Sequence, residues 1–192
     1  MGAGDKIYSM KNPIGDYKHS IQLFFDDESE NLISSYINEF RSNSLLNEDF
    51  INERYKPHIS LAVYRELEAE YSDRVLQKLA TRFTQFQLKF SHIGIFSAEL
   101  KVLYLGPTFS TALRDIHCLL HAQYRDRPEI CWDYYLTDNW VPHCGVMIDK
   151  KSENITQGMR LLMSKTLPQV RVTSLAVTGF PQKISYTFKA KT

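Results

Sequence analysis

The sequence predicts an α+β fold made of two pseudo-symmetric lobes of antiparallel sheet and helices around a central groove. Segments typical of strands and helices alternate in one order, and that order occurs once in each half of the 192 residues. No glycine-rich phosphate loop follows a strand, which argues against a Rossmann fold. We expect a single bilobal domain over 1–192, with lobe one at about 17–98, lobe two at about 99–182 and a last strand at 183–190.

The first half is expected to contain a strand, a helix, a strand that carries a histidine, a second helix and a third strand. The helix at 27–42 has apolar residues at helical spacing and an acidic first turn, which suits the helix dipole. The remaining elements are strands at 19–26, 58–64 and 87–97 and a helix at 73–86.

The second half repeats this order. A strand is expected at 100–107, and the helix after it, at 108–124, has a Thr or Ser residue available as an N-cap. A connection rich in polar and aromatic residues leads into the second histidine strand. The later elements are a strand at 143–149, a helix at 151–167 that contains Gly158, and strands at 169–180 and 183–190.

Bulk composition excludes several classes of protein. Hydrophobic residues make up 43% and charged residues 23%, which is ordinary for a globular chain. The net charge of +1 argues against a protein that binds long nucleic acid through its phosphates. Cys118, Cys131 and Cys144 suggest neither a disulfide framework nor a zinc site. No apolar run is long enough to span a membrane and no signal-peptide core is present, so we expect a reduced, cytoplasmic protein.

One short pattern introduces both histidine strands. Residues 56–64 read KPHISLAVY and residues 141–149 read VPHCGVMID, so each begins with a Pro-His step, one intervening residue and a small residue. Side chains alternate between the two faces of a strand. Alternation places His58, Ser60, Ala62 and Tyr64 on one face of the first strand. It places His143, Gly145, Met147 and Asp149 on one face of the second.

Two histidines that face one groove are suited to cleavage of a phosphodiester. One imidazole takes a proton from the attacking water or hydroxyl, and the other protonates the leaving oxygen. A hydroxyl on the same face, at Ser60, can donate a hydrogen bond to a non-bridging phosphate oxygen. Either histidine alone is more simply a surface or core residue, and the repetition favours the catalytic interpretation.

The two motifs resemble the paired His-x-Ser/Thr motifs of the two-histidine (2H) phosphoesterase superfamily, in the branch of 2′-5′ RNA ligases and RNA cyclic phosphodiesterases. The middle segment GIFSAELKVLYLGPTFSTALRDIHCLL resembles the link between the two lobes in that family. The resemblance implies a bilobal α+β fold and metal-independent chemistry at 2′,3′-cyclic or 2′-5′ phosphodiesters. It implies that His58 and His143 are the acid/base pair and that Ser60 is a phosphate donor.

The second motif departs from the family pattern at Gly145, where the family has Ser or Thr. Loss of one donor to a developing oxyanion typically costs on the order of 10²–10³ in rate. The backbone of Gly145, a water or a neighbouring side chain would have to substitute. The alternative is a catalytically weak protein of the same fold that binds a nucleotide or RNA end.

Other residues near the motifs are weaker candidates for substrate contact. The aromatic loop residues Trp132, Tyr134, Tyr135 and Trp140 would stack on a base or pack as a lid. Tyr55 and Lys56, with Arg54, precede the first motif, and Tyr64 shares its face. His117 and His121 have the spacing of a metal pair but no accompanying ligands, so we expect a helix face, and we expect Cys144 to be inert.

The sequence therefore predicts a phosphoesterase that needs no metal or other cofactor and acts on a small nucleotide or RNA end. We expect no membrane partner and no binding of long nucleic acid, and the sequence does not indicate an oligomeric state.

Overall fold

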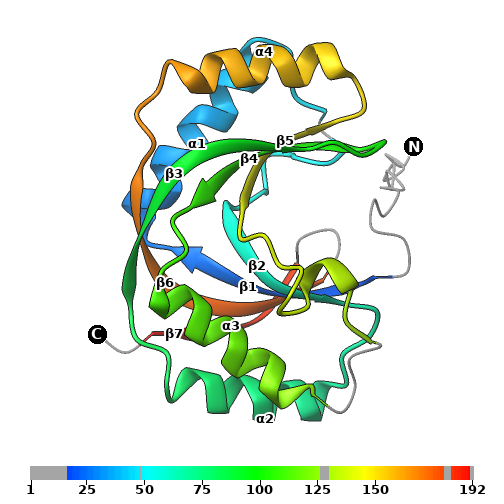
Figure 1. The fold of residues 1–192 in the computed structure, drawn as a ribbon, viewed down its shortest axis with the longest axis vertical. Helices are drawn as coiled ribbons and strands as arrows, with labels where there is room; N and C mark the ends of the chain where they lie inside the picture. The colour runs from blue at the N-terminus through cyan, green and yellow to red at the C-terminus, as the bar shows by residue number, and fades with distance from the viewer. Residues whose placement is uncertain (1–16, 48, 126–129, 180–182, 191–192) are drawn as a thin grey trace, which may run out of the picture.

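A computed structural model describes residues 17–47, 49–125, 130–179 and 183–190 of the chain (Figure 1). The strands are β1 (His19–Phe25), β2 (His58–Tyr64), β3 (Phe86–Phe96), β4 (Lys101–Pro107), β5 (Cys144–Asp149), β6 (Gln169–Gly179) and β7 (Lys183–Lys189). The helices are α1 (Asp27–Ser42), α2 (Ala69–Ala80), α3 (Thr111–Gln123), α4 (Ser152–Met163) and the short 3₁₀ helix η2 (Asp133–Tyr135). The predicted α+β class and the predicted order of elements are confirmed.

Two predicted helix ends are wrong. The helix expected at 73–86 is α2, which begins earlier, at Ala69, and ends at Ala80. After a turn at 81–82, the β-branched and aromatic residues of 83–86 favour extended backbone and lead into β3. The helix expected at 151–167 is α4, which ends at Met163, five residues before Pro168. Proline disfavours helical backbone in the residue before it, so the helix ends early.

All seven strands belong to one antiparallel sheet, and the path through it is β2-β1-β6-β3-β4-β5, with β7 paired to β6. The two histidine strands, β2 and β5, therefore lie at opposite ends of this path. They nevertheless contact each other. The sheet thus curves until its two ends meet, and this curvature is what brings the two Pro-His motifs together.

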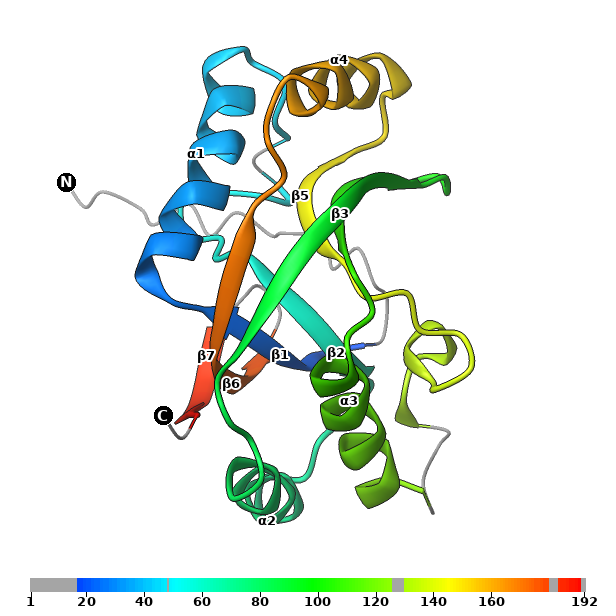
Figure 2. The same cartoon turned by 60° about the vertical axis from the view of Figure 1, so that its left-hand side comes forward.

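The internal repeat is visible in the arrangement of elements. The order β1-α1-β2-α2-β3 recurs as β4-α3-β5-α4-β6, and each half contributes its last strand to the sheet of the other, since β3 pairs with β4 and β6 with β1. Helices α1 and α4 lie at one end of the molecule and α2 and α3 at the other (Figures 1 and 2). Strand pairing sets no boundary between lobes, so the division expected at 98–99 stays a prediction.

The apolar faces of both halves meet in one core. Helix α1 begins where the Asp26 carboxylate accepts a hydrogen bond from the N–H of Ser29, and its apolar stripe of Ile33, Ile37 and Phe40 is almost fully buried. That stripe faces the sheet, where α1 contacts β1, β5 and β6. Helix α1 therefore contacts the histidine strand β5 directly and packs on β1, the strand that pairs with the other histidine strand, β2.

Candidate active site

Both histidines are oriented by the same local hydrogen bond. The Nδ1 atom of His58 lies 2.8 Å from the carbonyl oxygen of Lys56, and the Nδ1 atom of His143 lies 2.8 Å from that of Val141. A carbonyl oxygen only accepts, so Nδ1 carries the hydrogen in each ring and Nε2 holds the lone pair of the neutral form. The two Pro-His steps therefore specify one tautomer twice.

Contacts between the motifs show that the two histidines lie close together. The sulfur of Cys144 makes a hydrogen-bond contact with the backbone N–H of His58. The Tyr55 hydroxyl, three residues before His58, donates to the carbonyl oxygen of Gly145 at 2.8 Å. The positive charge of His143 also acts on His58. The motifs are thus joined directly, side chain to backbone, in both directions.

The electrostatic environment favours the neutral form of both imidazoles in the free protein. Burial lowers the pKa of His58 to about 4; the carbonyl of Lys56 opposes this and the nearby charge of His143 adds to it. Burial also lowers the pKa of His143, against the raising effect of the Val141 carbonyl. Anionic phosphate placed between the two rings would favour their protonated forms, since an opposite charge raises the pKa of a histidine.

Aromatic rings surround each imidazole. The ring of His58 lies 5.9 Å from that of Phe24 and 5.4 Å from that of Tyr55, between centroids. The ring of His143 lies 4.7 Å from that of Phe96 and 5.5 Å from that of Tyr104. These contacts explain both the desolvation of the imidazoles and their fixed orientation.

The support for His143 depends on a glycine in β3. Tyr104 stacks on Phe96 at 4.5 Å and lies across Gly94 of the neighbouring strand, where a Cβ would overlap its ring. Sequence reasoning missed Phe96 and Tyr104. An isolated glycine inside a predicted strand was the available signal, because such a glycine marks close approach of another group.

Matching β-bulges follow the two histidines. In β2, Gln22 of β1 pairs with Ser60 and Ile21 with Ala62, which leaves Leu61 as the extra residue. In β5, Tyr104 pairs with Gly145 and Leu103 with Met147, which leaves Val146 as the extra residue. In both strands the extra residue is the third after the histidine, so the two halves of the chain share the position of the bulge as well as the order of elements. Bulges often re-aim side chains beside active sites.

The bulge in β5 corrects the predicted division of its faces. Strict alternation placed Met147 and Asp149 with His143, but Met147 is fully buried and Asp149 is 5% exposed. The Asp149 carboxylate accepts hydrogen bonds from the N–H of Lys151 and from the Asn154 amide, both at 2.8 Å, and so holds the start of α4. The extra residue reverses the alternation, which sequence periodicity could not show.

Ser60 lies on the histidine side of its bulge and is hydrogen-bonded to the hydroxyl of Tyr135. Burial raises the pKa of Tyr135 to about 12, and the hydrogen bond from Ser60 opposes that shift. The ring of Tyr135 also lies 6.4 Å from that of His143. Of the four aromatic residues in the loop before β5, Tyr135 is therefore the one that reaches both motifs.

His117 and His121 support the bulge and η2 through backbone carbonyls. The Nε2 of His121 lies 3.4 Å from the oxygen of Leu61, and the Nε2 of His117 lies 3.0 Å from that of Tyr135. The indole of Trp140 stacks on His117 at 3.8 Å, almost parallel, and its N–H donates to the Ser60 carbonyl at 3.1 Å. The helix-face interpretation of the two histidines agrees with these contacts.

The remaining predicted contact residues are placed differently. Trp140 is only 9% exposed and lies behind Ser60. Tyr64 is fully buried at the far end of β2, with its ring 4.9 Å from that of Tyr124. Lys56 is exposed and forms an ion pair with Glu30 of α1. A contact of these three side chains with substrate stays a prediction. Cys144 is fully buried and its pKa is raised to about 12 by burial, so the thiol is protonated.

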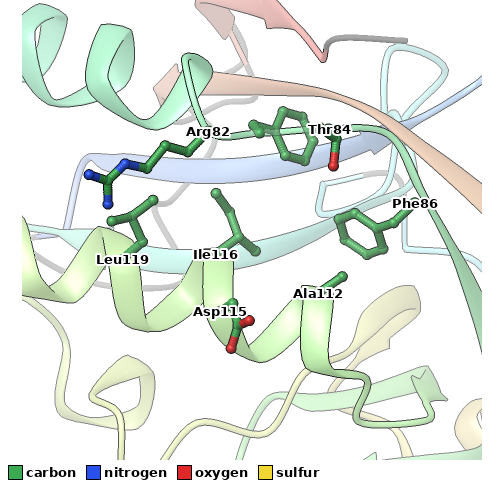
Figure 3. Close-up of a pocket in the computed structure, with 8 residues that line it drawn as sticks. Arg82, Thr84, Phe86, Ala112, Asp115, Ile116 and Leu119 are labelled. Atoms are coloured by element: carbon green, nitrogen blue, oxygen red, sulfur yellow. The ribbon is translucent and has the colours of Figure 1, made fainter.

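Other features of the described residues lie away from the histidines. A cavity of about 380 Å³ is lined by the segment between α2 and β3, the start of β3 and α3, with Arg82, Phe86 and Asp115 among its residues (Figure 3). Within the described ranges, no group of three or more His, Cys, Asp or Glu side chains is arranged to hold a metal ion. No described helix combines the length and apolar content needed to cross a membrane.

Comparison with known proteins identifies the family. The family model of the 2′-5′ RNA ligase superfamily matches residues 26–179, which include both Pro-His motifs. The chain belongs to the 2′-5′ RNA ligase superfamily. The resemblance seen in the motifs is thereby confirmed, while a search of curated protein sequences found no match.

Solved structures share the fold of this 2′-5′ RNA ligase superfamily member at low sequence identity. A structure described as a phosphoesterase is 15% identical, with a TM-score of 0.62 over 92% of this chain and 99% of its own. E. coli LigT complexed with 3′-AMP is 16% identical, with a TM-score of 0.59 over 92% and 99%. LigT complexed with NADP+ is 14% identical, with a TM-score of 0.58 over 92% and 98%. These likenesses establish the LigT-like fold.

Proposed function

We propose that the protein hydrolyses a 2′,3′-cyclic or 2′-5′ phosphodiester of a nucleotide or RNA end by acid/base catalysis, without a metal. The observation that carries this proposal is the pair of imidazoles, each with Nδ1–H donated to a carbonyl two residues earlier and each with Nε2 as the reactive nitrogen. Two such rings beside one phosphate meet the requirement for simultaneous proton removal and proton donation.

The reaction of a 2′,3′-cyclic phosphate would proceed in one displacement. His58 takes a proton from water as the water oxygen bonds to phosphorus, and the bond from phosphorus to one ribose oxygen breaks. His143 gives its proton to that oxygen, so the products are a phosphomonoester and a free hydroxyl. The low pKa of His58, about 4, supports its role as the base, because it is unprotonated at neutral pH.

Ser60 would donate a hydrogen bond to a non-bridging oxygen as negative charge develops there. It is well placed because it follows His58 by two residues on the same side of the strand, before the bulge. The backbone N–H of Gly145 is the corresponding group of the second motif.

The test is turnover of 2′,3′-cyclic nucleotides and 2′-5′ dinucleotides in EDTA. We expect His58→Ala and His143→Ala each to lower kcat by about 10²–10⁴-fold, the usual contribution of a general acid or base. His19→Ala is the matched control, since His19 lies at the opposite end of the β1–β2 register. Full turnover by either motif variant would contradict the proposal.

A second function is favoured by Gly145. A protein that keeps the site but lacks one hydroxyl would bind a nucleotide or RNA end and turn it over weakly or not at all. Binding that both motif variants weaken, without turnover by the wild type, would support this binding role and exclude the enzyme.

A further inference from the structure

We propose that Tyr55 supplies the hydroxyl donor that Gly145 lacks, so that the second histidine motif is completed by the loop in front of the first. This inference rests on the proposed function, and it assigns a further catalytic residue to that reaction.

The position of the Tyr55 hydroxyl carries the proposal. It donates to the Gly145 carbonyl at 2.8 Å, and a Cβ added to Gly145 would lie 3.6 Å from the phenol oxygen. A serine or threonine hydroxyl at position 145 would be one bond further from the backbone than that Cβ. The phenol oxygen therefore lies beside the space in which the missing hydroxyl would be found.

The environment of Tyr55 suits a hydrogen-bond donor. Burial raises the pKa of Tyr55 well above its ordinary value, and the neighbouring Cys144 and Tyr135 raise it further. The phenol is thus neutral and protonated throughout the physiological range. Its ring packs against that of His58, which holds the hydroxyl close to the histidine pair.

A change of partner would let the hydroxyl reach the phosphate. The O–H bond of a phenol has two favoured orientations in the plane of the ring, so the hydrogen can leave the Gly145 carbonyl without movement of the ring. That carbonyl keeps a weak contact with the Cys144 thiol, at 4.0 Å. The charge that develops on a non-bridging oxygen makes it a stronger acceptor than a carbonyl.

The first motif has a reciprocal arrangement. The residue two after His58 is Ser60, and its hydroxyl is hydrogen-bonded to Tyr135, from the loop that precedes the second motif. The residue two after His143 is Gly145, and Tyr55 comes from the loop that precedes the first motif. Each motif is thus joined to a tyrosine from the other half, and Tyr55 is the donor where no side-chain hydroxyl exists.

There is space for a side chain at position 145, so the proposal can be tested by removing the hydroxyl of Tyr55 and adding one at position 145. The added Cβ would meet Tyr55 and Val102 only at 3.6 Å, an ordinary van der Waals distance. We expect Tyr55→Phe to lower kcat for a 2′,3′-cyclic nucleotide by about 10²-fold, as expected for loss of one oxyanion donor. We expect Tyr55→Phe/Gly145→Ser to recover much of that loss. Tyr36→Phe is the matched control, since it removes a hydroxyl of α1 that donates to the carbonyl oxygen of Thr166.

A second readout separates donation to phosphate from simple bracing of the loop. The two diastereomers of a 2′,3′-cyclic phosphorothioate place sulfur, a poor acceptor, on one or the other non-bridging position. Tyr55→Phe should change the ratio of their turnover rates, and Ser60→Ala should change it in the opposite sense. Tyr36→Phe should leave the ratio at the wild-type value.

The outcomes distinguish this inference from the proposed function. An active wild type in which Tyr55→Phe keeps full kcat, or loses rate equally on both diastereomers, would overturn the role of Tyr55 and leave the histidine pair standing. A wild type without turnover would overturn both.

Discussion

At the scale of single residues, the two imidazoles share a tautomer but differ in surroundings. His58 is affected by burial and by the charge of His143, whereas burial alone lowers the pKa of His143. Two neighbouring histidines titrate as a pair, so their apparent pKa values belong to the pair. This coupling sets the pH range in which one ring is a base while the other is an acid.

We predict a bell-shaped dependence of kcat/KM on pH, with its maximum below pH 6.5. Activity should rise as His58 loses its proton near pH 4 and fall as His143 loses the proton that it must donate. Rates measured from pH 3.5 to 9 in EDTA would show both limbs. Ser60→Ala should lower the whole curve without moving its limbs, and a maximum at pH 7.5 or above would contradict the assignment.

The sequence predicted the residues that recur and missed those defined by distant contacts. His58, Ser60 and His143 were identifiable because one pattern is written twice. Tyr135 could not be separated from the other aromatic residues of its loop, since only the folded chain shows which ring reaches the hydroxyl of Ser60. Trp140 is a residue type that often stacks on a base, but in the folded chain its ring is buried against His117.

At the scale of elements, the paired bulges decide which side chains face the histidine pair. The order and type of the strands and helices could be predicted from hydrophobic periodicity, because local propensity and burial pattern agree within these elements. The bulges depend on pairing with β1 and β4, so no pattern within β2 or β5 contains them. The end of α2 was missed for the related reason that the chain must enter β3 at Phe86, where pairing with β6 begins.

Asp149 provides a test of the bulge in β5. We predict that Asp149→Ala lowers the free energy of unfolding by about 1–2 kcal/mol, because it leaves the N–H of Lys151 and the Asn154 amide without their acceptor. Asp149→Asn, which keeps one acceptor oxygen, should lose less. Urea unfolding measures the change, and the control is Asp138→Ala, which alters an exposed aspartate in a loop.

An alanine variant of Asp149 as stable as the wild type would contradict this structural role. Its kcat should stay near that of the wild type, because the carboxylate faces α4 and not the histidines.

At the scale of the whole molecule, the buried histidines make the free energy of unfolding depend on pH. Burial lowers the pKa of His19, His58, His117, His121 and His143. The unfolded chain therefore binds protons from about pH 6.5 downward, while the folded chain resists them until the lower pKa values are reached. Stability is full above pH 6.5 and is lost as the pH falls toward about 4 for His58 and about 3 for His117.

We predict that the urea midpoint falls steadily between pH 7 and pH 5. His117 is 2% exposed, and such a group contributes at most about 1.4 kcal/mol per pH unit. His117→Gln keeps an N–H donor for the Tyr135 carbonyl but does not titrate, so its stability should depend less on pH. An equal dependence in the variant and the wild type would show that His117 does not contribute.

The pairing of β1 with β6 also affects the order in which the strands can pair during synthesis. Residues His19 to Phe25 pair with β2 on one side and with Val172 to Gly179 of β6 on the other, so a nascent chain can pair β1 with β2 long before β6 exists. Throughout that interval the apolar side chains Ile21 and Leu23, fully buried in the finished sheet, lack their final neighbours. Exposed strands of this kind aggregate or are bound by chaperones. The pairing of β1 with β6 is thus completed only after residues 172–179 have been synthesised, later than both histidine motifs.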